Sequence, residues 1–67
     1  MQYSVRAYSE ASDEVCEMYS ANTYSHAKWW LSGYLRDGMG GWDEFIILNS
    51  DDEPCAMFDA DHGWTHY

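Results

Sequence analysis

Positive charge is the property that this sequence of 67 residues has least of. Three Lys and Arg residues stand against twelve Asp and Glu residues, which gives a formal net charge of −9 with histidine neutral. Direct binding to nucleic acid needs a basic face, and attraction to an anionic membrane needs clustered basic residues. The composition therefore argues against both, and it predicts a partner that is positively charged.

Long apolar runs are also missing. The longest run, residues 45–48, is far too short to cross a bilayer. Residues 1–6 lack the apolar segment of a secretory signal, so we expect a cytoplasmic protein inside a host cell. A chain of this length forms one small core, and residues 1–67 are therefore expected to form a single domain.

Residue types that serve catalysis or metal binding are few and unsuitably spaced. Cys16 and Cys55 belong to no CxxC pair, and we expect two buried free thiols. The glycines of residues 38–41 follow a predicted helix instead of preceding one, which argues against a phosphate-binding loop. Residues 59–63 resemble the start of a calcium loop, but the glycine stands at position five instead of six. We therefore expect no enzymatic activity, no cofactor and no metal site.

Aromatic residues, by contrast, are abundant. The chain has four Trp, six Tyr and two Phe residues. An acidic chain without aromatics would be disordered, whereas each buried aromatic side chain removes about 150–250 Å² from water. This composition predicts a folded core beneath a strongly negative surface.

The first third of the chain predicts a hairpin. Residues 2–9 alternate in the period of a strand, and residues 10–14 are typical of a turn. Residues 12–20 fit either a strand or a helix that Ser12 would cap. We favour the strand.

One helix follows, and its apolar stripe is the clearest local pattern. Ser25 is the expected N-cap, with Thr23 and Asn22 as competitors, and Gly38 suits the left-handed position after the helix. Gly33 weakens the helix by about 1 kcal/mol and is expected to let it approach a sheet closely. The stripe consists of Ala27, Trp30, Leu31, Tyr34 and Leu35.

The remaining third predicts strands. Residues 42–48 predict a strand, and its last four residues, 45–48, are all apolar, so both faces of the strand are apolar there. This favours a central strand that the helix covers on one side. A turn at 49–53 leads to a strand that begins at Pro54, and a tight turn at 61–63 leaves residues 64–67 for a short terminal edge strand. The predicted fold is α+β: a small antiparallel sheet, β-β-α-β-β with this optional last strand, and one helix packed on one face.

The carboxylates almost all lie outside the predicted helix. Alternate residues of a strand are about 6.6–6.8 Å apart, which is close to the spacing of phosphates along a DNA strand. An array of carboxylates on a sheet can therefore imitate a row of phosphates, because the Arg fork binds both groups. The carboxylates predicted to bind the partner are Asp13, Glu14, Glu17, Asp43, Glu44, Asp51, Asp52, Glu53, Asp59 and Asp61.

The aromatic residues have two predicted roles. Trp64 and Tyr67 stand in an acidic tail, where they suit an interface anchor inside a charged rim, and we include them in the partner-binding set. Alternatively, these two side chains would pack against the core and close it at one end. The aromatic residues predicted for the core itself are Trp30, Tyr34, Trp42 and Phe45.

In size, charge and layout the whole chain resembles small acidic proteins of phages and mobile elements, including anti-CRISPR proteins and other DNA mimics. Residues 25–31 (SHAKWWL), a glycine turn and residues 42–48 (WDEFIIL) are similar to the helix-to-hairpin passage of some of these proteins. The resemblance includes no diagnostic motif and assigns no role to a single residue. It implies stoichiometric inhibition of a CRISPR effector by occupation of its DNA-binding or guide-binding channel.

The leading hypothesis is thus an inhibitor that presents a DNA-mimicking carboxylate array to a basic CRISPR effector subunit. One alternative is a small interaction module that binds its partner through aromatic residues. Another is a mimic that inhibits a different DNA-binding protein, such as a restriction enzyme or a repressor.

Overall fold

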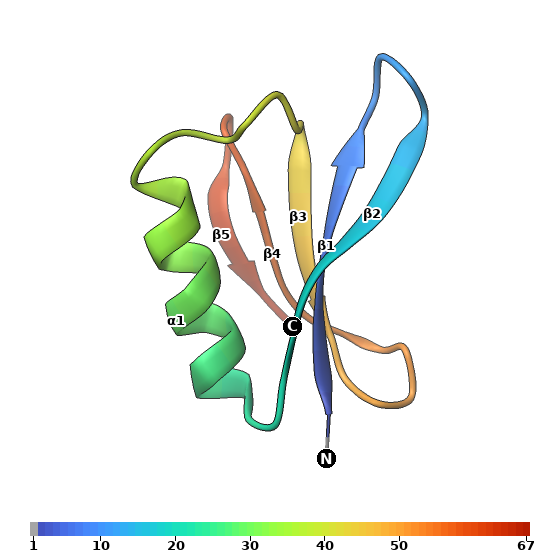
Figure 1. Cartoon of the computed structure of the whole chain (residues 1–67), viewed down its shortest axis with the longest axis vertical. Coiled ribbons are helices and arrows are strands. Elements are labelled where there is room, and N and C mark those ends of the chain that lie inside the picture. The colour runs from blue at the N-terminus through green and yellow to red at the C-terminus, as the bar shows by residue number, and fades with distance from the viewer. Residues whose placement is uncertain (1) are drawn as a thin grey trace.

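The computed structural model describes residues 2–67 and contains one helix and one five-stranded antiparallel sheet (Figure 1). The strand order is β2-β1-β3-β4-β5, and the helix packs on one face of the sheet. This confirms the predicted α+β fold. The elements are β1 (Tyr3–Ser9), β2 (Glu14–Ala21), α1 (Tyr24–Leu35), β3 (Glu44–Leu48), β4 (Pro54–Asp59) and β5 (Gly63–His66).

The ambiguous segment after the first turn is a strand. β2 pairs with β1 from Tyr3↔Ala21 to Ser9↔Glu14, with an irregular register near Val5. β3 lies between β1 and β4 in the middle of the sheet, as its apolar residues on both faces predict. The optional terminal strand is also present, since β5 pairs with β4 at the edge of the sheet.

The helix begins two residues earlier than an N-cap at Ser25 would place it. Thr23 has an extended backbone, and its Oγ1 accepts a hydrogen bond from the N–H of His26 at 3.1 Å. Ser25 lies inside the first turn, so its prediction as N-cap is wrong and its competitor Thr23 is correct. Arg36 follows as the C-cap, and Gly38 has the left-handed backbone that glycine adopts without steric cost (φ 105°).

The core forms where the predicted stripe of α1 meets the sheet. Ala27 and Leu31 are fully buried, while Trp30, Tyr34 and Leu35 are partly buried against the same cluster. Small residues permit this close packing, because a helix can approach a sheet where the side chains between them are short. On the sheet, the fully buried side chains are Val5, Ala7, Phe45, Ile47 and Ala56.

Of the four aromatic residues predicted for the core, only Phe45 is fully buried. Trp30, Tyr34 and Trp42 pack around its margin and stay partly exposed. Trp30 stacks on Tyr19 of β2 at 4.7 Å between ring centroids, and on Tyr34 at 5.5 Å. The large rings thus seal the edge of a small core that contains mostly aliphatic side chains.

Two expectations about small residues are wrong. A side chain at Gly33 would meet no atom within 4 Å, so this glycine does not bring the helix close to the sheet. Cys16 is exposed and Cys55 is only partly buried, although both are free thiols as expected. Cys16 is exposed because the first half of the edge strand β2 extends with its turn beyond the cover of the helix (Figure 1).

The only helix in the described part of the chain, α1, is too short to span a membrane.

Candidate functional site: the acidic end of the sheet

Three connections bring carboxylates together at one end of the sheet. The β1–β2 turn, the start of β3 and the β4–β5 turn all lie at the upper end in Figure 1, whereas the β3–β4 loop lies at the lower end. We call the upper end the acidic end. It contains seven of the twelve carboxylates: Glu10, Asp13, Glu14, Asp43, Glu44, Asp59 and Asp61.

Five of these carboxylates line one shallow hollow of about 390 Å³. Neither Lys nor Arg is among the described residues around it, and His62 is the only basic side chain that lines it. The apolar part of its wall comes from Met39, Trp42 and Ala60. The hollow therefore has the charge that a Lys or Arg side chain of another protein would complement.

Asp43 is fixed in place by its neighbours. One of its carboxylate oxygens accepts a hydrogen bond from the backbone N–H of Glu10 at 2.6 Å. Its own N–H donates to the carbonyl oxygen of Tyr8 at 2.9 Å. These two bonds join the β1–β2 turn to the segment before β3, and they limit the movement of the carboxylates on both sides.

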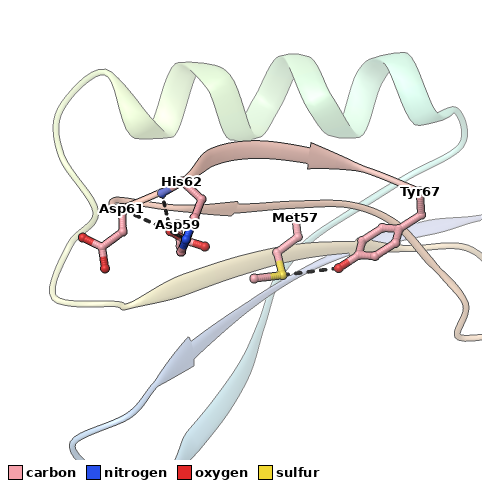
Figure 2. A network of polar contacts seen from close by, with 5 residues as sticks. All are labelled: Met57, Asp59, Asp61, His62 and Tyr67. Atoms are coloured by element: carbon pink, nitrogen blue, oxygen red, sulfur yellow. Dashed lines mark hydrogen bonds and ion pairs between the residues drawn. The ribbon is translucent and has the colours of Figure 1, made fainter.

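Asp59 organises the β4–β5 turn (Figure 2). Its Oδ1 accepts hydrogen bonds from the N–H of Asp61 at 2.9 Å and of His62 at 2.7 Å, and lies 3.1 Å from Nδ1 of the His62 ring. The bond from the His62 N–H is the largest influence that lowers the pKa of Asp59, and partial burial opposes it. The structure thus stabilises the ionised form of Asp59.

The pKa of Tyr8 is raised by the carboxylates at the acidic end. Its hydroxyl donates a hydrogen bond to Asp13 at 3.0 Å, and this bond is the main cause of a raised pKa for Tyr8. Burial and the charges of Asp13, Glu10 and Glu44 raise the pKa further. Carboxylates from two connections therefore act on one phenol group.

The carboxylates are not arranged along single strands as the spacing argument expected. No described strand has two carboxylates on alternate residues. Glu44 and Asp59 instead face each other across β3 and β4, Glu14 begins β2, and the other carboxylates of the acidic end stand in the connections. The array runs across the ends of neighbouring strands, which are about 4.8 Å apart.

The other predicted carboxylates lie elsewhere. Asp51, Asp52 and Glu53 occupy the β3–β4 loop at the opposite end, where Asp52 lies 3.6 Å from the guanidinium of Arg6. Glu17 of β2 is the register partner of the same Arg6 in β1. The predicted set therefore does not form one surface, and the loop cluster is partly neutralised.

None of the three Lys and Arg residues lines the hollow. α1 contains no acidic residue, and Lys28 and its C-cap Arg36 are two of the three fixed cations. The ammonium of Lys28 lies 2.9 Å from Nε2 of His66 and 5.1 Å from the centre of the Trp64 ring. The helix thus contains none of the carboxylates, which stand in the strands and connections.

Trp64 and Tyr67 do not form a common contact surface. Trp64 lies on the helix side, where it packs edge-on against Phe58 and under Lys28. Tyr67 lies on the other side of the sheet, where its hydroxyl contacts the sulfur of Met57 at 3.5 Å (Figure 2). Tyr67 is 68% exposed, whereas Trp64 is partly buried. An aromatic interface that needs both residues is therefore disfavoured.

No group of three His, Cys, Asp or Glu side chains in residues 2–67 is arranged to hold a metal ion. His62 instead lies against Asp59 in the turn, and His66 lies against Lys28. Sequence reasoning missed Tyr8 and His62 as neighbours of the acidic groups. Both contacts depend on turn geometry that residue spacing alone does not define.

Comparison with protein-family models, with curated proteins and with solved structures gives no match, so the functional argument rests on the residues of this chain.

Proposed function

We propose that this protein is an inhibitor that binds a basic nucleic-acid-binding surface of another protein through its acidic end. The observation that supports this most is the hollow lined by five carboxylates from three connections, with no fixed cation among its described residues. Hydrogen bonds hold Asp43 and Asp59 in defined positions. A fixed anionic array loses little side-chain entropy on binding, which favours affinity.

The size of the molecule suits a short piece of nucleic acid. Its longest dimension is 32 Å, which corresponds to about nine base pairs of DNA at roughly 3.4 Å each. The acidic end would occupy part of a groove that otherwise accepts phosphates, since Arg and Lys bind carboxylate and phosphate in similar ways.

The particular target that we propose is a CRISPR effector in the cytoplasm of a host cell, with phage or mobile-element origin for the inhibitor. The support for this part is the resemblance in size, charge and layout to anti-CRISPR proteins. A mimic that inhibits another DNA-binding protein uses the same surface and is distinguished only by the target that responds.

The experiment is a competition assay with purified CRISPR effector complexes of several types. Fluorescence anisotropy follows the release of a labelled target DNA as this protein is added. For a responsive effector we expect release at about one equivalent, and direct binding of this protein to the effector, measured without DNA, should weaken at higher salt because the contacts are ionic. Simultaneous, independent binding of the DNA and the protein to the effector would contradict the proposal.

A pair of variants tests the surface. Glu10→Lys with Asp61→Lys reverses two exposed carboxylates of the hollow whose side chains fix no turn. Asp51→Lys with Glu53→Lys changes the net charge equally at the opposite end and is the matched control. We expect the first pair to reduce competition by at least about tenfold and the control to reduce it much less.

A further inference from the structure

The outer side of α1 contains a second feature that the acidic end does not explain. A groove of about 340 Å³ runs along the helix, lined by Trp29, Trp30, Ser32, Gly33, Tyr34 and Arg36. Trp29 is 71% exposed, the largest exposed fraction among the large hydrophobic side chains of the described chain. Trp, Tyr and Arg are the residue types that most often anchor protein interfaces.

Gly33 lies in the helix at a position where a side chain would meet nothing else in the molecule. A glycine inside a helix costs about 1 kcal/mol relative to alanine. Its backbone is helical, and a side chain built there would meet nothing within 4 Å. Neither conformation nor internal packing therefore requires this glycine, which leaves close approach of an external group at the middle of the groove as its physical use.

Arg36 is the one fixed cation in residues 2–67 that has no partner. Arg6 lies near Asp52, and Lys28 contacts His66 and Trp64. In a chain with twelve carboxylates an unpaired guanidinium is unexpected, and this one lies beside aromatic rings in the groove. A guanidinium beside exposed rings is suited to stack on an aromatic face.

We propose that this groove binds the same groove of a second copy of the chain, with two antiparallel helices crossing at Gly33. A two-fold axis through Gly33 places residues equally far before and after it opposite each other. Arg36 then faces Trp30 of the second copy, three positions on either side of the axis, and the contact occurs twice. The groove is thus complementary to itself.

Charge favours this face over any other for self-association. Two molecules of charge −9 repel each other, and the repulsion is weakest where neither presents a carboxylate. α1 contains no carboxylate and includes Lys28, and the nearest carboxylate along the chain, Asp37, follows its C-cap Arg36. The groove and the hollow of the acidic end share no lining residue, so the proposal does not depend on the proposed function.

The expected dimer is weak. A two-fold axis at Gly33 lets the two helices overlap only over residues 30–36, about 10 Å of helix, so the interface is at the lowest end of the specific range, and we expect a dissociation constant of high micromolar or above. The proposed contact resembles that of two packed helices whose backbones approach each other at a small residue. Higher salt should strengthen the dimer, because salt screens the repulsion between the two acidic molecules.

The test is analytical ultracentrifugation of the full chain from micromolar to millimolar concentration, at low and high salt. We expect a monomer–dimer equilibrium that shifts toward dimer with salt. Gly33→Leu should raise the dissociation constant by at least about tenfold, since two leucines would overfill the crossing point. Arg36→Ala should weaken the dimer less.

Controls separate loss of the dimer from loss of the fold. Gly33→Leu fills open space and improves helix propensity, so its thermal unfolding temperature should not fall. Ser25→Leu adds the same side chain to an exposed helical position outside the groove and should leave the dimer intact. A wild-type chain that stays monomeric at millimolar concentration in high salt would overturn the proposal, as would a dimer that Gly33→Leu leaves unchanged.

Discussion

The carboxylate of Asp43 accepts a hydrogen bond of 2.6 Å from the backbone N–H of Glu10, 33 residues earlier in the chain. This bond connects the β1–β2 turn to the start of β3. It brings together carboxylates that are remote in sequence, and it is the contact on which the shape of the acidic end most depends. Like charges held close together destabilise a fold, so a specific bond is needed to offset their repulsion.

Removing this bond should loosen the acidic end. We expect Asp43→Ala to lower the free energy of unfolding by about 1 kcal/mol and to speed hydrogen exchange at the Glu10 amide. Asp43→Asn retains an acceptor and should have a smaller effect. Urea denaturation and NMR hydrogen exchange measure the two quantities. A Glu10 amide with unchanged protection in Asp43→Ala would show that the bond is unimportant in solution.

The lowered pKa of Asp59 predicts a pH dependence of stability. The unfolded group titrates near pH 3.9, and the folded pKa is lower. Ionised Asp59 therefore stabilises the fold above about pH 4, and this stabilisation is lost as the pH falls through the folded pKa. Asp59→Asn should be less stable than wild type at pH 7, and the difference should shrink below pH 4. A difference that is constant across this range would contradict the account.

The raised pKa of Tyr8 can be tested with two matched variants. Asp13 and Asp52 both have positive φ angles, of 52° and 61°, so glycine suits either position. Asp13→Gly removes the acceptor of the Tyr8 hydroxyl and should return the Tyr8 pKa toward 10.0. Asp52→Gly, at the other end of the sheet, should leave it raised. NMR titration of the tyrosine ring carbons resolves the two outcomes.

The sign of the Tyr8 effect on stability follows from the same shift. A raised folded pKa means that the neutral phenol is stabilised, fully so below the unfolded pKa near 10. This contribution is lost as the pH rises through the folded pKa. If Asp13→Gly and wild type lost stability identically in alkali, Asp13 would not be the main cause of the shift.

The N-cap at Thr23 predicts a difference between two neighbouring hydroxyl residues. Thr23→Ala removes the acceptor of the His26 N–H and should lower the free energy of unfolding by about 1 kcal/mol. Ser25→Ala, inside the first turn, should change it by no more than a few tenths of a kcal/mol. Thermal or urea denaturation of both variants tests the assignment. An equal loss in both would contradict the cap geometry.

Local patterns predicted most of the fold. The alternation of residues 2–9 and the apolar stripe of the helix depend on neighbours a few residues apart, and both are confirmed. Even the separation of Trp64 from Tyr67 follows from alternation, since residues an odd number of positions apart in a strand lie on opposite faces. The prediction that grouped them as one surface did not apply that rule.

The site depends on relations that local patterns do not contain. The acidic end forms because the strand order places the β1–β2 turn beside the start of β3 and the β4–β5 turn. A glycine in the helix predicts close approach to the sheet, but Gly33 faces open space, which the local pattern does not show. Cys16 was expected to be buried because free cysteines usually are, but its strand extends past the helix.

The most direct test of the central claim is the salt dependence of direct binding to a responsive effector without DNA, measured for wild type and for the two charge-reversal pairs. If the acidic end imitates phosphates, the logarithm of affinity should fall linearly with the logarithm of salt concentration. Glu10→Lys with Asp61→Lys should reduce that slope, while Asp51→Lys with Glu53→Lys should leave it close to that of wild type. Equal reduction by both pairs would mean that bulk charge determines binding, and a wild-type slope near zero would contradict the account.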